Sequence, residues 1–188
     1  MSLLRPLLVS FSALTLATGA IYPVLVTGLA RVLFPRQSQG SPLLVHGQLR
    51  GSRMIGQATE DPRYFWGRPS LTAPYATNAS VSAGSTLAAS NPALQAAVAR
   101  RIQIVRASEP QQTAPIPQDL VTASASGLDP HISLEAARWQ APRIARLRSV
   151  PVGDLVVLVE KHSQSNPLGE AFVTVLDLNA ALDTSARR

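Results

Sequence analysis

The N-terminus is the segment that most constrains this chain of 188 residues, because residues 6–30 contain no charged side chain. As a helix, these roughly 25 residues would be about 37 Å long, and the hydrocarbon core of a bilayer is about 30 Å thick. Arg5 flanks one end of the segment, and Arg31 and Arg36 flank the other. We therefore predict a membrane anchor at residues 1–36, with one spanning helix at about residues 6–33.

A cleaved signal peptide is the main alternative to an anchor. The residues before Ala20, Ala17-Thr18-Gly19, resemble a weak cleavage site. However, the apolar run continues to Phe34, which is too long for a signal peptide and favours an uncleaved anchor. Pro23 lies within the run and predicts a kink, because proline cannot donate a helical hydrogen bond.

One face of the predicted helix carries small side chains at helical spacing: Ala13, Ala17, Ala20, Val24 and Gly28. Small residues let a second helix approach closely within a membrane. We predict that this face packs against a membrane helix of a partner. The alternative is that alanine and glycine are simply common in such helices.

The charge pattern leaves two orientations open for the domain that follows the helix. Basic residues beyond the helix slightly outnumber those before it, which favours a cytoplasmic domain. A very short N-terminal tail before a large domain instead describes a signal anchor, and large domains are translocated largely regardless of their charge.

The composition excludes several kinds of chemistry. Without cysteine, the chain has no disulfide, no catalytic thiolate and no cysteine-ligated metal. The formal net charge of +6 would suit nucleic acid, an anionic membrane or an acidic partner. Trp139 is the only aromatic residue within the basic run of Arg138, Arg143, Arg146 and Arg148, so we predict a solvated helix face and no nucleic-acid partner.

After a polar linker at residues 37–42, residues 43–188 predict one mixed α/β (α+β) domain. We expect strands at 43–50, at 54–55 after a turn at Gly51-Ser52, and at 172–178. Residues 154–162 fit either a strand or a helix, and 179–186 fit a short terminal helix.

Two further helices have clear start signals. Asn91-Pro92 predicts the first, with a buried stripe formed by Leu94, Val98, Ile102 and Val105. Ser133 predicts the N-cap of the second, which Pro142 should break or kink near Gln140-Ala141.

The sequence contains none of the motifs GxxxxGK[ST], GxGxxG, HExxH, GxSxG or DKTG. His46, His131 and His162 are scattered, without the spacing of a metal site. We therefore predict a protein without catalytic residues, without a metal and without a tightly bound cofactor.

The stretch DLVTASASGLDPHIS, residues 119–133, has two interpretations. It is a turn that leads into the helix capped by Ser133, since Gly, Asp and Pro favour turns. Alternatively, the polar groups of Ser124, Ser126 and Asp129 form a ligand-binding or docking surface.

Six segments in a fixed order carry a resemblance to one family: GSRMIGQ (51–57), YFWGRPS (64–70), SAGSTL (82–87), SNP (90–92), the stretch 119–133, and VTVLDLN (173–179). Following a single N-terminal anchor, they resemble KdpC, the C subunit of the bacterial high-affinity potassium-transporting P-type ATPase. The resemblance extends from the anchor to Asp183.

The resemblance implies a non-catalytic accessory subunit that assembles with a potassium-channel-like subunit and a P-type ATPase subunit. It implies a catalytic chaperone that raises the ATP affinity of the ATPase subunit, with ATP bound only in that complex. It also implies a single-pass protein of the bacterial inner membrane, and favours a periplasmic over a cytoplasmic domain.

Within ARWQAPRIA (137–145), which is similar to the family pattern A-x-x-Q-V-x-R-V-A, Gln140 and Arg143 are the first candidates for a nucleotide or partner contact. The alternative function is that of a membrane-anchored periplasmic ligand-binding or hydrolytic domain.

Overall fold

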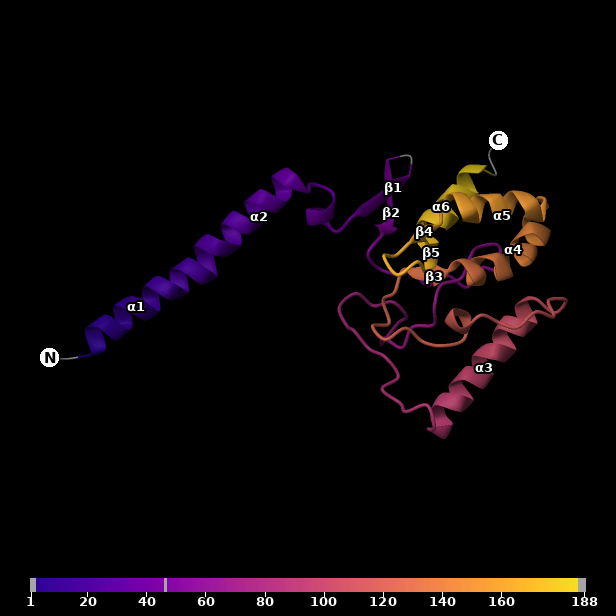
Figure 1. The fold of residues 1–188 in the computed structure, drawn as a ribbon, viewed down its shortest axis with the longest axis horizontal. Helices are drawn as coiled ribbons and strands as arrows, with labels where there is room; N and C mark the ends of the chain where they lie inside the picture. Colours follow the sequence, from indigo (N-terminus) through magenta and orange to yellow (C-terminus); the bar gives the residue numbers. More distant parts are fainter. Residues whose placement is uncertain (1–2, 46, 186–188) are drawn as a thin grey trace. The chain divides into compact units, whose positions relative to one another are not determined.

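The computed structural model describes residues 3–45 and 47–185, and the chain forms two compact units, Met1–Pro42 and Leu43–Arg188 (Figure 1). The predictions for His46 and Ala186 lie outside the described residues. The first unit holds one apolar helix, Leu4–Leu33, with a mean hydropathy of 1.7 and no buried residue. It is the one candidate membrane span in the described part of the chain, so the prediction of a single N-terminal apolar helix is confirmed.

The apolar helix consists of α1 (Leu4–Leu16), the π-helical turn η1 (Ala17–Ile21) and α2 (Tyr22–Leu33). Pro23 cannot donate a hydrogen bond, and the widened turn lies immediately before it. The amide of Tyr22 bonds to the carbonyl of Ala17, five residues earlier. The helix therefore accommodates Pro23 without a break. Its hydroxyl groups also bond within the helix, as those of Ser10 and Thr18 do, which suits a segment surrounded by lipid.

The linker forms the short 3₁₀ helix η2 (Gln37–Gln39). A two-stranded sheet follows, β1 (Pro42–Val45) and β2 (Gln48–Ser52), so the prediction of a single strand at 43–50 is wrong. Residues 51–52, predicted as a turn, belong to β2. The strand predicted at 54–55 is wrong, because the amide of Ile55 bonds to the carbonyl of Ser52 in a tight turn. The chain then runs without helix or strand to residue 91.

A small antiparallel sheet of order β3-β5-β4 anchors the rest of the unit. It consists of β3 (His131–Ser133), β4 (Gln164–Ser165) and β5 (Ala171–Thr174), with Ile132 paired to Val173. Helices α4 (Leu134–Arg148), α5 (Val152–Lys161) and α6 (Val175–Ser185) lie beside it (Figure 1). Their buried faces and the sheet form one core with Phe65, and the predicted mixed helix-and-sheet domain is confirmed.

The structure decides three predictions about where these helices and strands begin and end. Ser133 caps α4, as predicted, but the helix continues through Pro142 to Arg148. The predicted strand 172–178 ends at Thr174, because Val175, Leu178 and Leu182 have helical spacing and form the buried face of α6. Residues 154–161 are helical, in α5, and His162 is the C-cap of this helix.

Helix α3 (Pro92–Ser108) starts at Asn91, whose side chain accepts a hydrogen bond from the amide of Ala93, as predicted. The predicted buried stripe is wrong for most of its length. Val105 is the one buried residue of α3, whereas Ile102 is 39% exposed. The short 3₁₀ helix η3 (Gln118–Leu120) follows, and Leu120 enters the core.

Candidate functional site

Two side-chain amides hold the irregular segment 60–70 against the helices. Gln140 on α4 accepts a hydrogen bond from the amide of Trp66 (2.8 Å) and donates one to its carbonyl (3.1 Å). Asn179 on α6 does the same for Phe65, at 2.9 and 3.0 Å. Each side-chain amide therefore supplies the hydrogen bonds that a neighbouring strand would give this backbone, and the Phe65 side chain is fully buried in the core.

Arg143 lies beneath the same segment and is fully buried. Its guanidinium donates to the carbonyls of Pro62 and Tyr64 and to Gln140, and it lies 4.4 Å from the ring centroid of Trp66. Burial lowers the pKa of Arg143 to about 10. The predicted solvated basic face is therefore wrong at Arg143, one turn after Trp139 in the core.

The first candidates, Gln140 and Arg143, thus lie together and bond to the backbone of residues 62–66. All polar atoms of the Gln140 amide have partners inside the domain, with a further bond to the carbonyl of Ala136. Their visible role is to position the YFWGRPS segment.

The start of the segment 60–70 is held by Arg148 of α4 and by an ion pair within the segment. Arg148 donates to the carbonyl of Arg63 (2.8 Å) and to Asp183, and its guanidinium lies 4.5 Å from the Tyr64 ring centroid. Hydrogen bonds from Arg63 lower the pKa of Asp61 to about 2. Residues 61–66 are thus a rigid, non-repetitive segment whose geometry depends on side chains from α4 and α6.

The candidates Ser124, Ser126 and Asp129 lie in a loop that is bonded to two other loops. The amide of Ser124 bonds to the carbonyl of Pro69, and the carbonyl of Ser126 accepts from the amide of Ala83. Ser124 is buried, and its hydroxyl has no partner among the described residues. The loop is thus held mainly by main-chain groups of the two serines, and the Ser126 hydroxyl accepts a bond from the amide of Leu128.

Glycine is required where these loops cross. A Cβ on Gly84 would lie 2.6 Å from the carbonyl oxygen of Ala125. Gly127 has a φ of +70°, and a Cβ there would lie 2.7 Å from the carbonyl oxygen of Ala83. The family-like segments 82–87 and 119–133 therefore contact each other directly.

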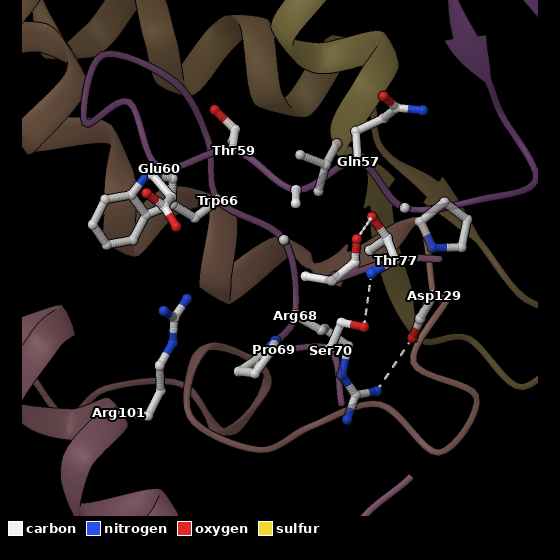
Figure 2. A pocket seen from close by; sticks show the side chains of 16 residues that line it. Gln57, Thr59, Glu60, Trp66, Arg68, Pro69, Ser70, Thr77, Arg101 and Asp129 are labelled. Carbon is white, nitrogen blue, oxygen red and sulfur yellow. Dashed lines mark hydrogen bonds and ion pairs between the residues drawn. The ribbon is translucent and has the colours of Figure 1, made fainter. Parts of the chain in front are cut away.

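Asp129 reaches a cleft of about 220 Å³, which Figure 2 shows from close by. Its carboxylate bonds to Arg68 (3.3 Å) and to the amide of His131 (2.9 Å). Trp66 and Arg101 line the other side of the cleft, and the hydroxyl of Ser70 bonds to the amide of Thr77 (2.9 Å) at its floor.

Sequence reasoning missed Trp66, Arg68, Arg101 and Asn179 as site residues. Three of them lie within the quoted motifs YFWGRPS and VTVLDLN, and membership in these motifs was the available signal. Arg101 had no such signal. The small residues predicted as a packing face belong to the exposed apolar helix of the first unit, whereas this site belongs to the second unit.

Residues 4–184 match the family model described as "KdpC: K+-transporting ATPase, c chain". The chain belongs to the KdpC family. It is 52% identical over 182 residues to the potassium-transporting ATPase KdpC subunit of Methylococcus capsulatus, covering 95% of this chain and 96% of the relative. It is 50% identical over 187 residues to the subunit of the same description from Yersinia pestis, covering 98% and 94%. The resemblance derived from the motifs is confirmed.

Proposed function

We propose that this chain is a non-catalytic accessory subunit of a potassium-transporting ATPase. It assembles with the potassium-channel-like and P-type ATPase subunits and raises the ATP affinity of the ATPase subunit. The observation that carries this proposal is the match to the KdpC family over nearly the whole chain.

The local geometry supports action on a partner rather than on a substrate. The polar candidates of α4 bond to the backbone of 62–66, and the serine-rich loop bonds to the loops beside it. Such bonding gives a rigid surface, and a rigid surface lowers the entropy cost of association. The exposed face around residues 60–70 is therefore the docking surface that we propose for a partner subunit.

We place the soluble domain in the periplasm and the chain in the bacterial inner membrane. The domain then lies on the side opposite to the cytoplasmic ATP. Its effect on ATP affinity passes through the membrane helix and the other subunits, with the face of Ala13, Ala17, Ala20, Val24 and Gly28 packed against one of them.

A topology reporter tests this placement. Alkaline phosphatase and, separately, a fluorescent protein active only in the cytoplasm are fused after Arg188 and produced with the other subunits. The proposal predicts phosphatase activity without fluorescence. Fluorescence without phosphatase activity would overturn the periplasmic placement and favour direct contact with cytoplasmic ATP.

The second candidate function is a membrane-anchored ligand-binding domain, favoured by the cleft beside Asp129. A measurement on the ATPase complex distinguishes the two functions. An accessory subunit changes the ATP dependence of the ATPase, whereas an independent binding domain leaves it unchanged.

A further inference from the structure

The hairpin of β1 and β2 has one face that points away from the rest of the second unit. Leu43 and Val45 of β1 and Arg50 of β2 line cavities beside α6. Because successive side chains of a strand point to opposite faces, Leu44 and Leu49 point away from α6. They are 62% and 67% exposed. We call these two leucines the outer face of the hairpin.

The hairpin is packed on one side only. It is a sheet of two strands, and a hairpin of two strands is marginally stable by itself in water. Leu43 is buried and attaches the hairpin to the second unit. No described part of that unit covers the outer face, and Met54, just after β2, is equally exposed. A surface that covered the outer face would therefore stabilise the hairpin.

A short linker joins the hairpin to the apolar N-terminal helix. The helix ends at Leu33 and β1 begins at Pro42. Residues 34–41 between them reach at most about 30 Å when fully extended, and the 3₁₀ helix η2 makes their path shorter. If the helix spans a membrane, the outer face is held close to that membrane at a high effective concentration.

The charge of this part of the chain suits a membrane surface. All 11 acidic residues lie at Glu60 or beyond. Between residues 31 and 59, the residues charged at pH 7 are all arginines: Arg31, Arg36, Arg50 and Arg53. Among the described residues, Arg53 is the one of these that forms an ion pair, with Asp177. Anionic headgroups attract basic segments beside a membrane helix, and no carboxylate within residues 31–59 opposes this attraction.

We propose that the outer face of the hairpin, Leu44 and Leu49, lies on the lipid surface beside the N-terminal helix. The leucines insert at the level of the headgroups, and the arginines of residues 31–59 lie among anionic headgroups. This contact orients the soluble domain on the membrane. The inference rests on the membrane anchor and does not depend on any effect on ATP affinity.

The experiment is site-specific fluorescence quenching with the full-length chain in nanodiscs of phosphatidylcholine and phosphatidylglycerol. Because the chain has no cysteine, one introduced cysteine carries the only thiol-linked fluorophore. Lipids with a nitroxide on the headgroup quench fluorophores at the membrane surface. We expect quenching in Leu44→Cys and Leu49→Cys to be about twofold stronger or more than in Gln48→Cys, the depth of an interfacial apolar face being the cause.

Gln48→Cys is the matched control, because Gln48 is exposed on the same strand as Leu49 but points to the opposite face. Gln103→Cys on α3, which lies away from the hairpin in Figure 1, controls for contact of the whole domain with lipid. A larger share of phosphatidylglycerol should strengthen the quenching in Leu49→Cys and leave Gln103→Cys unchanged.

Leu16→Cys, in the apolar helix, tests the anchor separately with nitroxides on the lipid acyl chains. Quenching at Leu16, together with equal quenching at Leu49, Gln48 and Gln103, would overturn the proposal and leave the anchor in place. No quenching at Leu16 would overturn both.

The same labels are then measured in the complex assembled with the other subunits. The proposal predicts that lipid quenching in Leu49→Cys persists there. Its loss on assembly would show that another subunit covers the outer face, and would overturn the assignment to lipid.

Discussion

Helices α3 and α4 have similar lengths and similar start signals, yet they differ in how the domain uses them. More than half of the residues of α4 are buried: Ala136, Ala137, Trp139, Gln140, Ala141, Arg143, Ile144 and Ala145. In α3, Val105 alone is buried, and Ile102 and Ile104 remain 39% and 46% exposed.

The comparison shows that buried polar side chains of a helix can hold the rest of the domain in place. Gln140 and Arg143 on α4 hold the backbone of residues 62–66, whereas the polar contacts of α3 are mainly arginine bonds at its edge. Helix α4 thus positions the backbone around Trp66, and α3 contributes few buried contacts to the domain. Four predictions test this difference.

The largest difference is expected between two isoleucines. Ile144→Ala in α4 removes a fully buried side chain and should lower the free energy of unfolding by about 2–5 kcal/mol. Ile104→Ala in α3 should lower it by less than about 1 kcal/mol, because almost half of the side chain is already exposed. Urea denaturation of the full-length chain in detergent measures both. Similar losses would show that α3 is as tightly packed as α4.

Two glutamines provide the next test. Gln140→Met should cost about 2–4 kcal/mol, since it leaves the amide and carbonyl of Trp66 and one donor of Arg143 without partners in the interior. Gln103→Met on the exposed side of α3 should stay within about 0.5 kcal/mol of the unchanged chain. The same denaturation series measures them. A neutral Gln140→Met would contradict the positioning role of Gln140.

The junction between the two helices is the third test. Arg146 on α4 pairs at 2.7 Å with Glu109, the residue after α3, whose side chain is only 2% exposed. Arg146→Gln removes the cation that donates a hydrogen bond to that buried carboxylate, and should cost about 1–3 kcal/mol.

Arg138→Gln is the control for the junction, because the pair of Arg138 with Glu160 is exposed on both sides. Its loss should cost at most about 0.5 kcal/mol. Equal losses of unfolding free energy in the two variants would mean that the pair of Arg146 with Glu109 stabilises the domain no more than an exposed pair does.

The smallest effects are expected at the helix caps. Ser133→Ala and Asn91→Ala each remove a side chain that accepts a bond from a first-turn amide, at a cost of about 1 kcal/mol. The loss at Ser133 should lower the stability of the whole domain, because α4 is part of the core. The loss at Asn91 should speed hydrogen exchange only in the first turns of α3. Faster exchange throughout the domain in Asn91→Ala would remove the distinction between the helices.

The sequence predicted correctly those helix starts that depend on a few neighbouring residues. Asn91 and Ser133 could be placed as caps because the signal lies within four residues of the helix start. Pro142 did not end α4, since the buried residues on both sides of it hold the helix in the core. The prediction of a buried stripe on α3 was wrong because few other elements pack against this helix. Periodicity shows that a face is apolar, but it does not show what covers it.

The site was less predictable than the fold. Gln140 and Arg143 were predicted as contacts for a nucleotide or a partner. Within the domain they bond to backbone groups of residues 62–66, more than 70 positions away. Asp129 was named for its loop, and only the structure brings it to Arg68 and to the cleft. Arg101 resembles any other exposed helix arginine until Trp66 is placed beside it.

The most direct test of the proposed function is the ATP dependence of potassium-stimulated ATP hydrolysis by the purified complex. It is measured with and without this chain, at equal amounts of the ATPase subunit. An accessory subunit that raises ATP affinity predicts a higher half-saturating ATP concentration when the chain is absent, restored when the chain is added back. An unchanged half-saturating concentration in an intact complex of the remaining subunits would contradict the account.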